Sequence, residues 1–195
     1  SVTGVQTCAL PIWTVGLCVG LAIGAAADAQ AEVKLPSVFG SHMVLQRDQP
    51  VPVWGWADTG EEVTVSFRDQ HVTVKAGQDG KWSTRLAPLQ VGEPGTLTVK
   101  GTNTIDLTDV LVGEVWVCSG QSNMGWSVQQ SLDSDLEAAA TGQPGIRLFR
   151  VPNVIAHEPQ DDVKVEWTAC TPQTVPSFSA VAYFFGRQLY ETLDV

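Results

Sequence analysis

Positive charge is scarce in this chain of 195 residues. Lysine and arginine number 11 against 21 aspartates and glutamates, which gives a formal net charge of −10. A protein that binds duplex nucleic acid needs clustered cations, and the sequence contains no basic run. The same balance disfavours an anionic membrane surface. The sequence therefore predicts no nucleic-acid partner, and no membrane partner once the leader described below is removed.

Residues that bind metals are also few, with three histidines and four cysteines. No Cys/His cluster has the spacing of a zinc site. The adjacent carboxylates Asp161 and Asp162 point to opposite sides of an extended chain, which is typical of solvated surface rather than a calcium cage. We therefore expect no metal ion and no other cofactor.

Long disordered tracts are not indicated either, because 44% of the residues are hydrophobic and only 16% are charged. This composition supplies enough apolar side chains for a packed core. The length suits one large domain or two small ones.

The N-terminus lacks the methionine and the positive residues that begin a secretory leader. Residues 13–26 are nevertheless apolar and uncharged, and a small-x-small pattern follows at 27–29. This pattern predicts a signal-peptide remnant over 13–29, cleaved after Ala29, and hence export to the periplasm or the extracellular space; a buried helix or an uncleaved anchor is the alternative. Residues 2–12 are similar to a translated sequencing-adaptor oligonucleotide, so we interpret 1–12 as an artefact that replaces the true start.

Two of the four cysteines fall in those N-terminal segments, at Cys8 and Cys18. The remaining pair is Cys118 and Cys170. Export makes a disulfide between them chemically possible, but free buried cysteine is also common. The sequence leaves both alternatives open.

Apolar and polar residues alternate with a period of two along 33–110. Alternating segments include 51–56, 63–67, 72–74, 82–86, 97–99 and 105–107. Short alternating segments separated by turn residues predict an antiparallel β-sandwich of the immunoglobulin or jelly-roll kind. The strongest hairpin signal is Gln78-Asp79-Gly80.

Three tryptophans in this region have two interpretations. Trp54 and Trp56 share one strand face, which a sugar-stacking platform with Trp82 requires. Tryptophan is mostly buried on average, however, so we favour packing in the sandwich core. His42 and His71 have no neighbouring nucleophile in the sequence and are interpreted as structural.

Beyond residue 110 the pattern changes to strands alternating with helices. A continuous apolar run, Val115 to Cys118, predicts a strand covered on both faces. The following pattern predicts a helix through Leu132, Leu136 and Ala140, a strand at 146–151, a further strand around 163–169, and a helix at 178–193. The buried stripe of that last helix is expected to contain Val181, Phe185 and Leu189, together with Ala182 and Leu193. Such an order predicts α/β layering.

Ser122 follows the predicted buried strand and precedes a predicted helix. Open α/β sheets build their sites at this place, and Gly120 and Gly125 permit a tight turn. A serine there can attack a carbonyl while the amides of the turn hold the developing oxyanion. The arrangement is analogous to a nucleophile elbow, although Met124 stands where that motif has its second glycine. The alternative is that Ser122 merely caps a helix.

Three blocks resemble one enzyme family in the family's own order. The block EVWVCSGQSNM (114–124) looks like the nucleophile block of the sialate O-acetylesterases, within the SGNH hydrolase superfamily. The block LPSVFGSHMVLQR (35–47), followed by VPVWGWA (51–57), is similar to that family's N-terminal β region. The block FSAVAYFFGR (178–187) matches the helix after its first block. The resemblance covers nearly all of 33–195.

This resemblance implies a serine esterase that works without a metal. Members of the family remove O-acetyl groups from sialic acid, and relatives act on acetylated plant glycans. Carried over, Ser122 is the nucleophile, and its own backbone N–H contributes to the oxyanion hole. Gln121 and Asn123 belong to the same motif, and we interpret them as positioning residues.

The chain departs from the family pattern where the base should be. A serine needs an adjacent base, and the family's histidine and aspartate block is absent; His157 lies in an irregular stretch and is interpreted as solvated. The few predicted strands cannot cover both helices. We therefore expect a β-sandwich at 33–110 and a truncated start of an α/β, flavodoxin-like SGNH domain at 111–195. The parent is predicted to be an enzyme and this fragment alone to be inactive.

Two other functions remain open at this point. The tryptophan-rich region could make the chain a non-catalytic carbohydrate-binding or adhesion module. An acyl esterase acting on lipids is a third possibility, but the sequence contains no obvious apolar lid.

Overall fold

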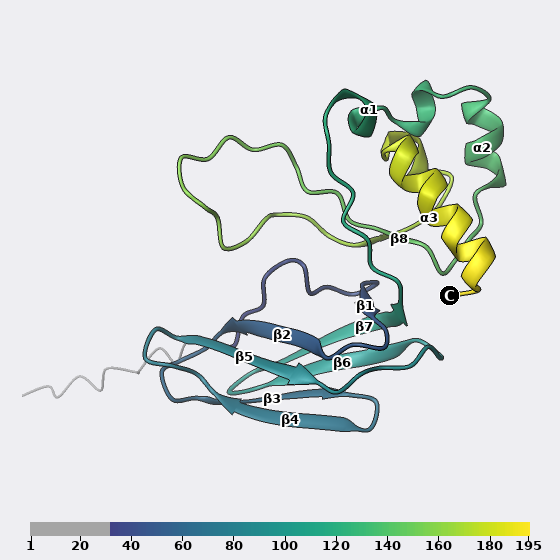
Figure 1. The fold of residues 1–195 in the computed structure, drawn as a ribbon. Coiled ribbons are helices and arrows are strands. Elements are labelled where there is room, and N and C mark those ends of the chain that lie inside the picture. Colours follow the sequence, from purple (N-terminus) through teal and green to yellow (C-terminus); the bar gives the residue numbers. More distant parts are fainter. Residues whose placement is uncertain (1–31) are drawn as a thin grey trace, which may run out of the picture.

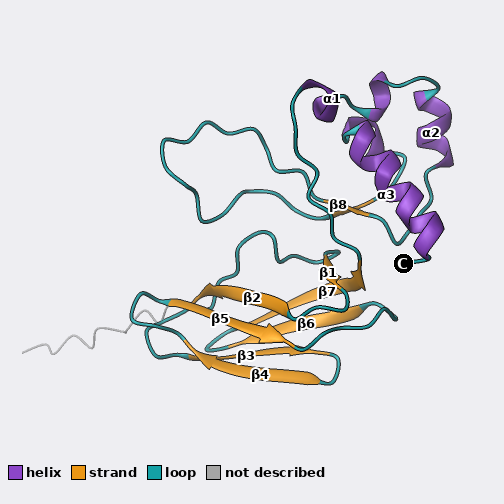
Figure 2. Ribbon diagram, in the orientation of Figure 1, coloured by secondary structure: helices purple, strands orange, loops and turns teal. Residues whose placement is uncertain are grey.

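The structure is a computed structural model that describes residues 32–195. The predicted adaptor segment and leader, 1–29, therefore lie outside the described residues. The described chain begins with strands and ends with helices (Figures 1 and 2). No helix among residues 32–195 is long and apolar enough to cross a membrane.

The first part is a half-open barrel in which a five-stranded mixed sheet and a separate two-stranded sheet pack around one core (Figure 1). Its strands are β1 (Val44–Gln46), β2 (Val51–Trp56), β3 (Glu62–Phe67), β4 (Gln70–Lys75), β5 (Lys81–Leu86), β6 (Gly95–Lys100) and β7 (Thr104–Gly113). Five strands are ordered β1-β7-β6-β3-β4, and β2 pairs with β5 alone. The period of two thus predicts the strands correctly, with β1 as an addition.

The expectation of a wholly antiparallel arrangement is wrong at one edge. Strand β1 runs parallel to β7, with Val44 opposite Leu111 and Gln46 opposite Gly113. A parallel pair needs a long connection, and here all the strands from β2 to β6 supply it. The sequence signal was short because β1 has only three residues.

The predicted hairpin at Gln78-Asp79-Gly80 is also wrong. The turn is tight, with Gly80 at a φ of +70° and its amide donating to the Gly77 carbonyl at 3.1 Å. It nevertheless joins β4 to β5, which belong to different sheets. The nearby hairpin joins β3 to β4, whose last ladder pair is Phe67 and Gln70.

The core of this part follows directly from the alternation. Along β3 the inward positions Val63, Val65 and Phe67 are at most 1% exposed, while the positions between them are not buried. Val53, Leu86, Leu97 and Val99 are equally inaccessible. One face of each strand therefore fills a single apolar interior.

The second part contains short elements around a smaller core. They are α1 (Ser122–Gly125), α2 (Ser134–Ala140), β8 (Arg147–Leu148), β9 (Thr168–Ala169) and α3 (Ala180–Leu193), with single 3₁₀ turns at Val128–Gln130 and Val175–Ser177. Their buried cluster consists of Val128, Leu148, Cys170, Val175, Ala180 and Tyr183.

The predicted α/β layering is not formed within residues 32–195. The strands expected at 146–151 and 163–169 shrink to two residues each, and they pair antiparallel only with one another. Helix α3 forms as predicted, and its predicted stripe is correct at Ala182, which is buried. The stripe is wrong at Val181, Phe185 and Leu193, which are 48%, 41% and 42% exposed, while Tyr183 is 2% exposed. Alanines beside Tyr183 bring that side of the helix close to its neighbours, so it becomes the inner face.

Candidate functional site

Ser122 is the first residue of α1, and Gln121 is the N-cap. The alternative that Ser122 only caps the helix is therefore wrong. Ser122, Gln121 and Asn123 are all exposed, and the Ser122 hydroxyl makes no hydrogen bond to any residue that the structure describes. An exposed hydroxyl without a structural partner is available to a substrate.

The turn around Ser122 is fixed by contacts with α3. The Ser179 hydroxyl lies 3.3 Å from the Met124 sulfur, and the Ala180 amide donates to the Trp126 carbonyl at 2.8 Å. Ser127 and Ser179 form an isolated antiparallel bridge. The helix block at 178–187 thus holds the serine block at 114–124 in place, and both are blocks that resemble the family.

Space is tight at one of the two glycines of the turn. A Cβ at Gly120 would lie 3.1 Å from the Met124 Cβ, whereas a Cβ at Gly125 would meet nothing within 4 Å. Met124, which occupies the second glycine position of the elbow motif, therefore packs back onto Gly120. The tight turn that the sequence predicted is present, although its strand is not.

The predicted strand Val115–Cys118 is wrong. These residues have no regular structure, and Val117 is 93% exposed. A strand needs a neighbour for its backbone groups, and no strand within residues 32–195 lies beside this segment. Its first two residues make specific contacts: the Val115 amide donates to Gln46 Oε1 at 2.9 Å, and the Trp116 ring meets Phe185 edge-on at 5.2 Å.

None of the three histidines touches Ser122. His42 Nδ1 lies 2.7 Å from Asp109 Oδ2, His71 Nδ1 lies 2.9 Å from the Ser66 hydroxyl, and His157 is exposed in the segment between β8 and β9. The described residues therefore bring no base to the nucleophile.

Asp109 joins the two parts of the molecule. Its Oδ2 accepts from His42 and also from Arg147 Nη2 at 2.8 Å, and the Arg147 side chain is only 6% exposed. The hydrogen bond from His42, helped by the Arg147 charge, holds the pKa of Asp109 below its ordinary value. Both His42 and Asp109 have positive φ, at 69° and 54°, which non-glycine residues adopt sparingly. Sequence reasoning missed this cluster because its members lie on three separate segments.

Further contacts between the two parts come from the segment after β8. Trp167 Nε1 donates to the Val38 carbonyl at 2.8 Å, and the Ser37 amide donates to Asp162 Oδ1 at 2.7 Å. Asp162 is exposed, as the sequence predicts, and it also anchors this segment to the β part.

Cys118 is exposed, Cys170 is buried, and both are free. Burial raises the pKa of the Cys170 thiol to about 11. The disulfide that the sequence left open is therefore not formed. No group of three or more His, Cys, Asp or Glu side chains suited to a metal ion occurs within residues 32–195.

Comparisons with known proteins bear on this chain as a whole. No protein-family model matches it. Sialate O-acetylesterase of Homo sapiens is 31% identical over 206 residues, which cover 94% of this chain and 39% of the human protein. The enzyme of Rattus norvegicus is 32% identical over 182 residues, which cover 83% of this chain and 34% of the rat protein.

A solved structure agrees with those relatives. A crystal structure of a carbohydrate acetylesterase from Xanthomonas citri superposes with a TM-score of 0.81 at 39% identity, over 84% of this chain and 38% of that one. The chain thus spans about two fifths of the length of the proteins it matches. Relatives and structure point to the same enzymes, and the chain belongs to the sialate O-acetylesterase family.

Proposed function

We propose that this chain is part of an exported serine esterase that removes O-acetyl groups from sialic acid or related acetylated glycans. The observation that carries the proposal is the exposed, unpartnered hydroxyl of Ser122 on a glycine-flanked turn. That turn lies in a chain related over most of its length to acetylesterases. Export rests on the apolar pattern at 13–29 alone.

The proposed reaction begins at Ser122. Its Oγ forms a bond to the acetyl carbonyl carbon while a general base takes the hydroxyl proton. The carbonyl electrons move onto oxygen, and amides at the start of α1, including that of Ser122, hold this oxyanion. The intermediate then collapses, and the sugar oxygen leaves with a proton. Water releases acetate from the acetylated serine and restores the hydroxyl.

Gln121 and Asn123 flank the nucleophile and are exposed beside it. We assign them the positioning of the glycan, because their amides can both donate and accept hydrogen bonds. The base and its orienting carboxylate are proposed to come from residues beyond those described, since no described histidine contacts Ser122.

We further propose that the folding unit is larger than this chain, as an immunoglobulin- or jelly-roll-like β-sandwich followed by the opening of an SGNH domain. Two observations support this. The relatives are longer than the matched region, and large apolar side chains close to Ser122 in the sequence are left uncovered, with Trp116 58%, Trp126 51% and Val117 93% exposed. Exposed large apolar side chains concentrated in one segment are typical of an interaction surface. The 195-residue chain alone is then inactive.

The test compares Ser122→Ala with Ser119→Ala in the full gene product, with whatever residues accompany this chain. Ser119 is an exposed serine in the same segment and serves as the matched control. We expect Ser122→Ala to lower acetate release from O-acetylated sialic acid and acetylated xylan to the residual level left when a triad member is removed. Ser119→Ala should retain activity. Unchanged turnover in Ser122→Ala refutes its role as nucleophile.

A fluorophosphonate probe gives an independent readout. It should modify Ser122 in the full gene product, as located by peptide mass spectrometry, and should leave the 195-residue chain unmodified because the base is missing. Labelling of the 195-residue chain at Ser122 would contradict the proposal that the base lies elsewhere.

A further inference from the structure

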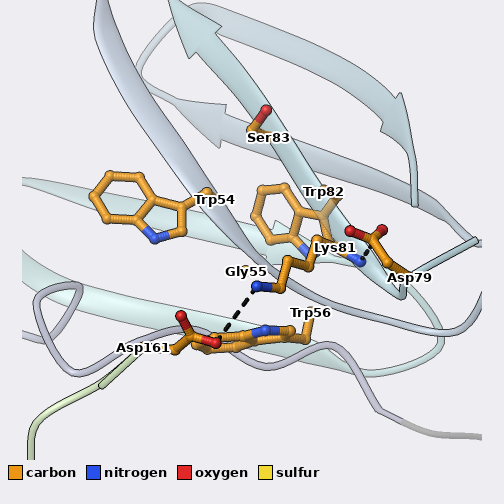
Figure 3. A pocket seen from close by; sticks show the side chains of 8 residues that line it. All are labelled: Trp54, Gly55, Trp56, Asp79, Lys81, Trp82, Ser83 and Asp161. Carbon is orange, nitrogen blue, oxygen red and sulfur yellow. Dashed lines mark hydrogen bonds and ion pairs between the residues drawn. The ribbon is translucent and has the colours of Figure 1, made fainter. Parts of the chain in front are cut away.

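A hollow of about 430 Å³ lies on the outer side of the β2–β5 pair (Figure 3). None of the residues that line it belongs to the turn at Ser122. Trp54 and Trp56 line it from β2, and their ladder partners Ser83 and Lys81 line it from β5. Asp161, from the segment between β8 and β9, closes one side. The preference for burying all three tryptophans is therefore correct for Trp82 and wrong for Trp54, which is 40% exposed.

The two indoles of β2 form a corner rather than a flat platform. Figure 3 shows the Trp54 ring face-on and the Trp56 ring edge-on, so their planes are not parallel. Phe39 packs edge-on against Trp54 at a centroid distance of 4.7 Å and an interplanar angle of 74°. Trp54 is thus fixed before any ligand arrives, which reduces the entropy that binding costs.

Trp82 supplies a second, independent observation. Its side chain lines the hollow and is only 3% exposed, yet its Nε1 has no hydrogen-bond partner among the residues that the structure describes. A buried indole N–H usually finds an acceptor. The Trp82 ring thus lies under Gly55 with an unpartnered N–H at the inner wall of the hollow.

The polar groups of the hollow select the charge of its ligand. Lys81 Nζ pairs with Asp161 Oδ2 at 3.4 Å, and the Asp79 carboxylate accepts from the Lys81 amide at 3.1 Å. The hollow is thus lined by two carboxylates and one ammonium, and the chain as a whole carries −10. An anionic ligand is disfavoured, whereas a neutral polyol finds both donors and acceptors.

We propose that this hollow binds one pyranose ring of a neutral glycan. The apolar C–H face of the ring stacks on Trp54, and its hydroxyls reach Lys81, Asp79 and Asp161. The site shares no residue with the Ser122 turn, so the tests of this proposal and of the esterase proposal are independent.

The test uses the complete 195-residue chain, cellohexaose as the neutral probe and sialyllactose as the anionic one. Isothermal titration calorimetry should detect millimolar binding of cellohexaose and none of sialyllactose. Trp54→Ala should weaken cellohexaose binding by about tenfold or more, as removal of an aromatic anchor does. Trp126→Ala is the matched control, because Trp126 is 51% exposed but lies outside the hollow, and it should bind normally.

A second readout covers the case in which Trp54→Ala fails to fold. The indole N–H resonance of Trp82, assigned through Trp82→Phe, should shift on addition of cellohexaose to the unaltered chain, while that of Trp126 stays in place. Absence of any cellohexaose binding overturns the proposal. So does binding that Trp54→Ala leaves unchanged, or a Trp82 resonance that does not respond.

Discussion

The cluster of Asp109, Arg147 and His42 allows a sharp test, because its two charged partners are buried unequally. The Arg147 side chain is 6% exposed and that of Asp109 is 35% exposed. Asp109→Asn and Arg147→Met each remove one charge of the pair. Asparagine also tolerates the positive φ at position 109, so Asp109→Asn changes charge with little change in backbone strain.

The two substitutions should not cost the same. Asp109→Asn leaves the Arg147 guanidinium buried without an anion, with only neutral acceptors, the Pro144 carbonyl and the new side-chain amide oxygen. Removing one partner of a fully buried pair costs about 3–5 kcal/mol, and the partial exposure of Asp109 reduces this to about 2 kcal/mol. Arg147→Met leaves a carboxylate that water and His42 still solvate, so about 1 kcal/mol is expected.

The assay is urea unfolding of both variants and the parent chain at pH 7 and at a series of lower pH values. Because the folded pKa of Asp109 lies below its ordinary value, its contribution is present above an unfolded pKa of about 4. That contribution is lost as the pH falls through the folded pKa. The parent and Asp109→Asn should therefore converge in acid. A larger cost for Arg147→Met than for Asp109→Asn, or a gap that does not narrow in acid, would refute the reasoning.

Three further predictions concern packing and exposure. Gly55→Ala should destabilise the chain by about 3 kcal/mol or more in urea unfolding, because its Cβ would collide with the Lys34 carbonyl; Gly142→Ala, where nothing lies within 4 Å, should be neutral, and equal costs would contradict the crowding at Gly55. Iodoacetamide should alkylate exposed Cys118 within minutes and buried Cys170 only in denaturant, as followed by peptide mass spectrometry; equal rates would contradict the burial that raises the pKa of Cys170 to about 11. Val117→Ser should change stability by less than about 0.5 kcal/mol, whereas a loss of 2 kcal/mol or more would mean that the segment is buried after all.

The β part was predictable because its strands have two unlike faces. Where Val63, Val65 and Phe67 alternate with less buried positions, the pattern predicts both the strand and the face of that strand that packs in the core. The exposure of Trp54 follows from its neighbour Gly55. Gly55 lies opposite Trp82 in the β2–β5 ladder, and because it has no side chain it makes room for the Trp82 ring in the core. Trp54 and Trp56 then share the outer face.

The second part was less predictable because its segments form regular elements only when neighbouring strands or helices pack against them, and the sequence pattern does not show whether those neighbours are present. The run Val115–Cys118 has the composition of a covered strand, but composition does not supply the neighbouring strands that pair with it. Likewise the large side chains of α3 suggested an inner stripe at Val181 and Phe185, whereas Ala180 and Ala182 permit the closest approach and decide the inner face. The turn at Ser122 was found because glycine spacing is a local signal.

The parallel pairing of β1 with β7 has a consequence for how the chain folds during synthesis. Arg47, just after β1, meets Glu114, just after β7, across 67 residues of sequence. Strand β1 therefore has no partner strand until the ribosome has synthesised β7, the last strand of the β part. Contacts this distant close slowly, so a chaperone that shields residues 44–46 early in translation should raise the yield of folded protein more than one that acts on the helices.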